Sequence, residues 1–122
     1  MEEIVLKALE KSICKWDRLC MGLECNYKSS SCALCQLFGS SCENEIKKTV
    51  CPVMTRSDNW QCADTPWEIY NEIFLDMKQY YPIAISDVKV VFFKYSLAYW
   101  AERELIFLLK LLPEGHRWRD QI

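Results

Sequence analysis

A mainly helical domain built around a cysteine-rich segment is the fold that this sequence predicts. Two long stretches carry apolar residues at steps of three and four, which is the spacing of one face of an α-helix. The stretch between them lacks that periodicity and contains six of the eight cysteines. About three helices around a zinc-stabilised insert are therefore expected, in a single domain that spans residues 1–122.

The size and composition of the chain support one folded core. At 122 residues it has the length of a single domain. Its 51% hydrophobic and 13% aromatic residues supply material for a core and exclude an intrinsically disordered chain. Because a domain of this size buries a smaller fraction of its surface than a larger one, a cross-link through its loop-rich part would stabilise it.

The charge balance and the apolar runs bear on partners and location. The formal net charge of −2 lowers the expectation of nucleic-acid binding, which depends on Lys and Arg neutralising phosphates. The opening Met1-Glu2-Glu3 does not match the basic start of a secretory signal. The strongest apolar stretch, residues 90–101, contains Lys94 and is shorter than the roughly 20 residues of a membrane helix. We expect a cytoplasmic protein that does not enter a membrane.

Residues 1–23 are expected to form the N-terminal helix. Its apolar positions share one face: Val5, Leu9, Ile13, Trp16, Cys20 and Leu23. Charged residues occupy the opposite face: Glu3, Lys7, Lys11 and Arg18. Gly22 lies where a glycine in the left-handed conformation commonly ends a helix.

Residues 24–64 form a segment of a different kind. Helical periodicity is weak there, and runs of serine together with Gly39 and Pro52 favour turns and loops. Six cysteines lie in this segment. We expect loops that are ordered by an internal cross-link, which the metal supplies.

Two further helices are predicted within residues 65–113. The first begins at Thr65, which can cap a helix, and continues with Pro66 at a favourable first position. Glu68 completes a capping box with Thr65. The apolar stripe of this helix consists of Trp67, Tyr70, Phe74 and Met77.

The last helix is expected from about Ser86 to Leu112, closed by Pro113 and Gly115, and it is apolar on nearly two faces. One stripe consists of Val88, Phe92, Tyr95, Tyr99, Ile106 and Leu109. The second stripe consists of Val90, Phe93, Leu97, Trp100, Leu108 and Leu111. A helix that is apolar nearly all round is buried on both sides. Either it is the central helix of the domain, or a homodimer or a partner protein covers the rest.

The mid-chain cysteines predict a metal site. In a reducing cytosol, clustered thiols hold a metal more often than they form disulfides. Cys32-Ala33-Leu34-Cys35 is a C-x2-C motif, which presents two thiolates to one ion. Structural zinc takes four ligands, and any one cysteine could instead be a small buried apolar residue. The predicted ligands are Cys32, Cys35, Cys51 and Cys62, with Cys25 and Cys42 as substitutes.

Other cysteine chemistries stay open. Cys51-Pro52 also ends some iron–sulfur motifs, so a [4Fe–4S] cluster is the minority alternative to Zn²⁺. Eight thiols could fill two metal sites, but Cys20 lies on the apolar stripe of the first helix and is expected in the core. Cys14 lies among basic residues, which favours a reactive thiol, although an incidental surface cysteine is the commoner case.

Three short motifs follow one another in the middle of the chain: Cys32-Ala33-Leu34-Cys35-Gln36-Leu37-Phe38, Cys51-Pro52-Val53 and Cys62-Ala63-Asp64-Thr65-Pro66-Trp67. Together they resemble a pattern in small uncharacterised phage and prophage proteins. The family pattern is roughly C-A-L-C, C-x-x-C-P and C-x-x-T-P-Y, followed by a helix. This chain places eight residues between Cys42 and Cys51 where the family has two, which favours Cys51 as the ligand. The resemblance implies a mobile-element origin and no known activity.

No catalytic constellation is recognised in the sequence, so an enzyme is not expected. The single histidine, His116, lies in a polar C-terminal segment and is expected to be solvated. The zinc-deaminase signature, H-x-E followed by P-C-x-x-C, is missing. The three glycines form no phosphate-binding loop.

Two functions remain. The first is a protein-interaction module, such as an inhibitor of a host defence complex, and it rests on the acidic balance, the apolar last helix and the aromatic residues Trp60, Trp67, Tyr80 and Tyr81. The alternative is a zinc-stabilised nucleic-acid-binding protein, in which phosphates and bases meet Lys28, Lys47, Lys48, Arg56, Arg117, Trp118 and Arg119.

Overall fold

The computed structural model describes residues 1–22, 32–38, 43–44, 49–53, 65–80 and 87–119. In chain order the elements are α1 (Glu3–Cys20), α2 (Ala33–Phe38), β1 (Glu43–Asn44), β2 (Thr49–Val50), α4 (Pro66–Tyr80) and α5 (Asp87–Leu109). The prediction of a mainly helical fold is confirmed. Within this described part, no helix has both the length and the apolar character needed to cross a membrane.

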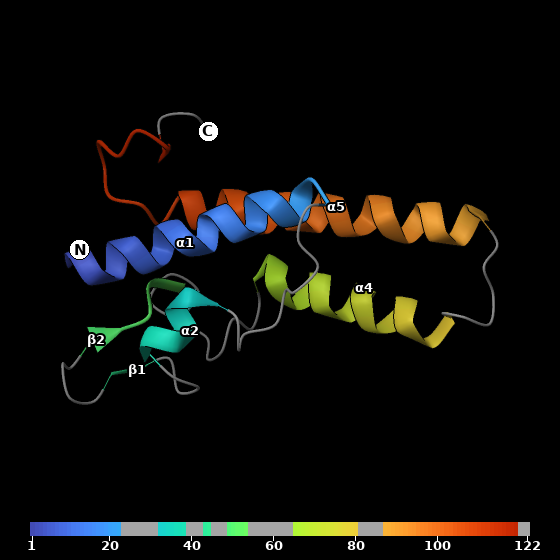
Figure 1. Cartoon of the computed structure of the whole chain (residues 1–122), viewed down its shortest axis with the longest axis horizontal. Coiled ribbons are helices and arrows are strands. Elements are labelled where there is room, and N and C mark those ends of the chain that lie inside the picture. The colour runs from blue at the N-terminus through green and yellow to red at the C-terminus, as the bar shows by residue number, and fades with distance from the viewer. Residues whose placement is uncertain (23–31, 39–42, 45–48, 54–64, 81–86, 120–122) are drawn as a thin grey trace.

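Helix α5 is the central element of the bundle. It packs against α1 and against α4 and runs antiparallel to both, as Figure 1 shows. Of the two arrangements left open by the sequence, α5 therefore takes the central one for most of its length. Its second predicted stripe faces inward, since Leu108 is buried and Leu97, Trp100 and Leu111 pack against the core. On the first stripe, Tyr95 and Tyr99 are exposed.

Helix α1 buries the face that its apolar spacing predicts. Val5, Leu9, Ile13 and Trp16 are all buried. The ring of Trp16 meets the ring of Tyr70 edge-on, with 5.2 Å between the centroids, so this contact joins α1 to α4. Gly22 follows the helix with φ +74°, the left-handed conformation expected of a glycine at this end.

The cysteine-rich segment contains more regular structure than a set of loops. Helix α2 occupies residues 33–38 and packs against α1, and β1 pairs with β2 as a short antiparallel hairpin. Leu34 and Phe38 lie one turn apart on α2 and are both buried. These two side chains anchor the segment to the core, so apolar contacts contribute to its order alongside any cross-link.

The chain beyond α5 folds back along α1 (Figure 1). A tight turn continues the helix through Leu112, and the guanidinium of Arg119 donates to the Leu112 carbonyl at 3.0 Å. Gly115 has φ +86°, which a residue with a side chain adopts only with strain. The predicted closure of this helix by Pro113 and Gly115 agrees with the observed turn.

Candidate metal centre

The C-x2-C motif lies at the start of α2, where it brings two sulfur atoms together. Cys32 immediately precedes the helix and Cys35 lies in its first turn. The Cys35 thiol donates a hydrogen bond to the Cys32 sulfur. On the other side, the Ser12 hydroxyl of α1 lies 3.5 Å from the same sulfur. Cys32 therefore sits at the contact between α1 and α2.

These hydrogen bonds favour the thiolate form of Cys32. The bond from Cys35 is the largest cause that lowers the Cys32 pKa from 9.0 to about 5. Burial opposes the shift, while Ser12 and the backbone N–H groups of Leu34 and Cys35 support it. Zinc binds the thiolate rather than the thiol, so the donor chemistry of this pair suits a metal ligand at neutral pH.

Of the other predicted ligands, one is buried in the core and the rest lie outside the described residues. Cys51 is 4% exposed and belongs to the core cluster against which Cys32 packs. Cys62 and the substitutes Cys25 and Cys42 lie outside the described residues. Within the ranges that are described, no group of three His, Cys, Asp or Glu residues stands close enough to hold a metal. Two of the four predicted ligands are thus brought together, and zinc itself stays a prediction.

A buried carboxyl that the sequence analysis did not single out lies near this pair. Glu104 of α5 is only 2% exposed, and its Oε2 accepts the backbone N–H of Trp67 at 2.9 Å. Trp67 is the second residue of α4, so Glu104 satisfies a donor that the first turn of a helix leaves unpaired. The sequence could have predicted the burial of Glu104, because this residue follows the same steps of three and four as the apolar residues Leu97, Trp100 and Leu108.

Burial raises the pKa of Glu104 from 4.5 to about 8. The Trp67 N–H opposes this shift, and the negative charge of Cys32 adds to it. Glu104 therefore lies close enough to Cys32 to be influenced by its charge. At neutral pH the carboxyl retains its proton in the folded protein for most of the time.

This shift predicts a contribution to the pH dependence of stability that Glu104→Gln removes. Between pH 4.5 and about 8 Glu104 holds a proton in the folded protein that it has released in the unfolded chain, so its contribution to the free energy of unfolding falls as the pH rises, opposite in sign to the contribution of Cys32. The amide of Gln still offers an oxygen to Trp67 and does not titrate. Urea unfolding near pH 8 should find the variant more stable than the native chain by roughly 1–4 kcal/mol. If the free energy of unfolding changed with pH in the same way for both proteins, the raised pKa of Glu104 would be contradicted.

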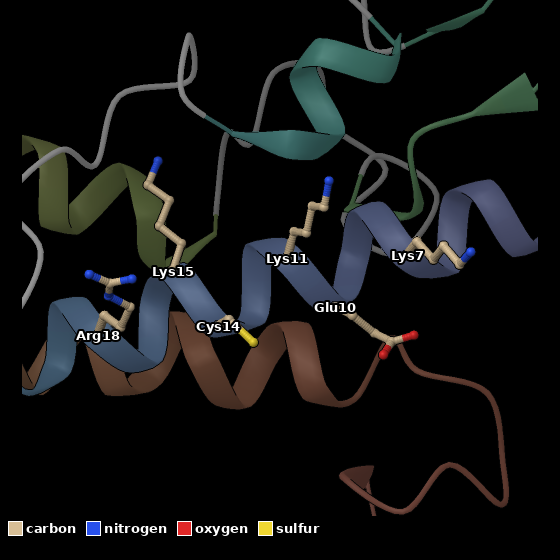
Figure 2. Close-up of a pocket in the computed structure, with 6 residues that line it drawn as sticks. All are labelled: Lys7, Glu10, Lys11, Cys14, Lys15 and Arg18. Carbon is tan, nitrogen blue, oxygen red and sulfur yellow. The ribbon is translucent and has the colours of Figure 1, made fainter.

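The two cysteines of α1 differ in their surroundings. Cys20 is half-buried and packs against the core, as expected. Burial, followed by the charges of Asp17 and Glu102, raises its pKa to about 11, so it stays a thiol. Cys14 is exposed and lines a shallow hollow of about 420 Å³ on the outer face of α1, together with basic side chains (Figure 2).

The expectation that His116 is solvated is wrong. Its side chain is 14% exposed, because the C-terminal segment folds back over α1. Its Nδ1 accepts the backbone N–H of Trp118 at 3.1 Å, and its Nε2 lies 3.9 Å from Glu10 Oε1. These contacts give His116 a structural role in fixing the C-terminal segment to α1.

The residues proposed to meet nucleic acid are only partly placed. Lys28, Lys47, Lys48 and Arg56 lie outside the described residues, as do Trp60 and Tyr81. Arg117 is exposed, with its guanidinium 5.9 Å from the Trp118 ring, whereas Arg119 is bonded to Leu112. One of the two C-terminal cations is therefore engaged in closing the helix rather than directed to solvent.

No protein-family model, curated protein or solved structure matches this chain. The resemblance to phage and prophage proteins accordingly stays a prediction from the sequence pattern.

Proposed function

We propose that this protein is a small zinc-stabilised module that binds another protein through the outward face of α5. The observation that carries the proposal is the pair of exposed aromatic residues on that helix. Tyr95 is 75% exposed and Tyr99 is 49% exposed, although neighbouring positions of α5 form the core. Arg103, one turn further on, places its guanidinium 4.9 Å from the Tyr99 ring.

This surface has the composition of a protein-binding hot spot. Tyr and Arg are enriched among the residues that contribute most of the energy of protein interfaces. Tyrosine offers a large contact area and loses little conformational entropy when it is fixed. The edge-on contact of Tyr99 with Trp100, at 5.2 Å, and the stacking of Arg103 order this surface before binding. We define Tyr95, Tyr99 and Arg103 as the α5 tyrosine surface.

Zinc has a structural part in this proposal. Cys32 and Cys35 would supply two ligands, with Cys51 and Cys62 as the other two, and the closed four-sulfur site would leave no position for a substrate. The ion would hold α2 to α1, while α1 and α4 support α5, which presents the binding surface. If the chain has the mobile-element origin that the resemblance implies, an inhibitor of a host defence complex is one module of this kind.

Removal of the tyrosine surface tests the proposal. The double substitution Tyr95→Ala with Tyr99→Ala should weaken partner binding about 30-fold if one of the two is a hot-spot residue and about 1,000-fold if both are, because each hot-spot residue contributes roughly 2 kcal/mol or more. The measurement is quantitative co-purification of cell protein with the tagged chain, followed by titration of the captured partner. Lys94→Ala is the matched control, since Lys94 is exposed on the same helix.

The salt dependence of binding separates this function from its alternative. A tyrosine-centred interface should change little as salt rises, whereas nucleic-acid binding weakens steeply because it releases counterions. Retention of DNA or RNA at low salt, lost at high salt and unaffected by the two tyrosine substitutions, would favour the nucleic-acid alternative. Equal capture of the partner by the native chain and the double variant would refute the α5 tyrosine surface.

A further inference from the structure

Among the cysteines that the structure describes, Cys32 and Cys35 are the pair that combines a neighbouring thiol with access to solvent. The Cys35 thiol donates to the Cys32 sulfur, and both side chains are partly exposed. Cys51 is buried, and Cys20 is half-buried against the core. Cys14 is exposed, but its neighbours in the hollow on α1 are charged residues rather than thiols. A water-soluble reagent can therefore reach Cys32 and Cys35 and find two sulfur atoms together.

The backbone around this pair has the separation that a disulfide requires. The N–H of Gln36 donates to the Cys32 carbonyl at 3.0 Å, so residues 32–36 form one helical turn. Two residues three positions apart in such a turn have Cα atoms about 5 Å apart. Disulfides span roughly 4.4–6.8 Å between Cα atoms. The two thiols can therefore be joined without unwinding the turn.

We propose that Cys32 and Cys35 are a site of reversible thiol–disulfide exchange with low-molecular-weight disulfides. One sulfur of the pair attacks a sulfur of the small disulfide, which forms a mixed disulfide and releases one thiol. The second sulfur of the pair then attacks the first, which closes the Cys32–Cys35 bond and releases the other thiol. The protons of the two cysteines pass to the two released thiols. Two electrons move from the protein to the small disulfide, and the reverse sequence restores the pair.

This exchange competes with zinc for the same two sulfur atoms. Zinc binds the sulfur of a thiolate, and a disulfide supplies no thiolate. Oxidation of the pair removes two of the four proposed ligands, and a bound ion protects the pair from oxidation. The competition rests on the structural zinc of the proposed function, whereas the exchange itself requires only the two cysteines.

The disulfide does not replace the ion as a cross-link. It closes a ring within one turn, whereas the proposed zinc site also holds Cys51 and Cys62. A bond between residues so close in sequence restricts the unfolded chain less than one that closes a long loop. Oxidation should therefore release the cysteine-rich segment much as chelation does. In a reducing cytosol the pair stays available to zinc, and an accumulation of small disulfides releases the ion.

Mass spectrometry of the full, metal-free chain in a buffer of reduced and oxidised glutathione tests the exchange site. Peptide mapping should place the first protein disulfide to form between Cys32 and Cys35, and dithiothreitol should restore both thiols. In Cys35→Ser the reaction should stop at glutathione bound to Cys32. This mixed disulfide should be at least about tenfold more populated than in the native chain, because no neighbouring thiol resolves it. Cys14→Ser is the matched control and should form the Cys32–Cys35 bond like the native chain.

The zinc-loaded chain tests the competition. Each disulfide formed should release one zinc ion, which a chromophoric chelator detects. Free zinc at about 100 times its dissociation constant should shift the exchange equilibrium about 100-fold toward the two thiols, because the ion binds only the reduced pair. Zinc that stays bound to the oxidised chain, or that leaves this equilibrium unchanged, would overturn the competition.

The site of the bond decides the proposal itself. A first disulfide that joins Cys51 or another cysteine would overturn it, as would a native chain that retains glutathione to the same extent as Cys35→Ser. A chain that binds no zinc and still closes the Cys32–Cys35 bond would refute the zinc site and support the exchange site, so the two failures are distinguishable. Circular dichroism verifies that the serine variants keep the helical content of the native chain.

Discussion

Protein purified under reducing conditions is expected to contain about one zinc ion per chain, and replacing Cys32 by Ser is expected to abolish its binding. Apparent binding energies of structural zinc are about 10–16 kcal/mol, comparable to the roughly 5–15 kcal/mol that stabilises a whole small domain. Loss of the ion should therefore release the cysteine-rich segment. Much of α1 and α5 should remain helical, because the two helices pack against each other and bury Leu9, Ala101 and Leu108.

Elemental analysis and circular dichroism before and after chelation measure this effect. Cys62→Ser should behave like Cys32→Ser, and Cys14→Ser is the matched control because Cys14 is exposed on the outer face of α1. Cobalt in place of zinc would report thiolate coordination by its absorption. Equal losses from Cys32, Cys62 and Cys14 would contradict the predicted ligands. A protein that contains no zinc, or that contains iron, would contradict the structural-zinc proposal itself.

Trp16→Ala is expected to lower the free energy of unfolding by about 3–5 kcal/mol. Trp16 is 3% exposed and holds the edge-on contact with Tyr70, so its loss opens a cavity between α1 and α4. Neither helix can move far to fill that cavity, because both are packed against α5. Urea unfolding at constant zinc concentration measures the change.

Two further substitutions sharpen this measurement. Trp16→Phe keeps an aromatic ring beside Tyr70 and should lose less than half as much stability. Ile4→Ala removes an exposed side chain from the same helix and should have little effect. A loss for Trp16→Ala no larger than that for Ile4→Ala would show that the α1–α4 contact contributes little to the fold.

Local patterns predicted most of the helical architecture. The apolar spacing of residues 1–23 identified the buried face of α1, because one helix with one apolar stripe has only one way to bury it. The predicted start at Thr65 and Pro66 agrees with α4, which begins at Pro66. These features depend on residues within a few turns of one another.

Helix α2 was not predicted, because six residues are too few to show a helical period. Its formation depends on the burial of Leu34 and Phe38 in the core to which α1 contributes Leu9. The C-x2-C spacing did predict that Cys32 and Cys35 act together, since three residues of separation bring them to one side of a turn. The contact between the Ser12 hydroxyl and the Cys32 sulfur could not be predicted in this way, because it depends on the packing of α1 against α2, two distant parts of the chain.

By itself, the sequence determined the helical class, the faces of α1 and the paired thiols of the C-x2-C motif. Only the tertiary structure decided which of the two apolar stripes of α5 is inside, because both satisfy the same helical period and the packing of α1 and α4 selects between them. The same packing leaves Tyr95 and Tyr99 exposed and encloses Glu104 against the first turn of α4. The rise of the Glu104 pKa to about 8 is a consequence of this burial, because the carboxyl is desolvated only when the folded helices exclude water from it.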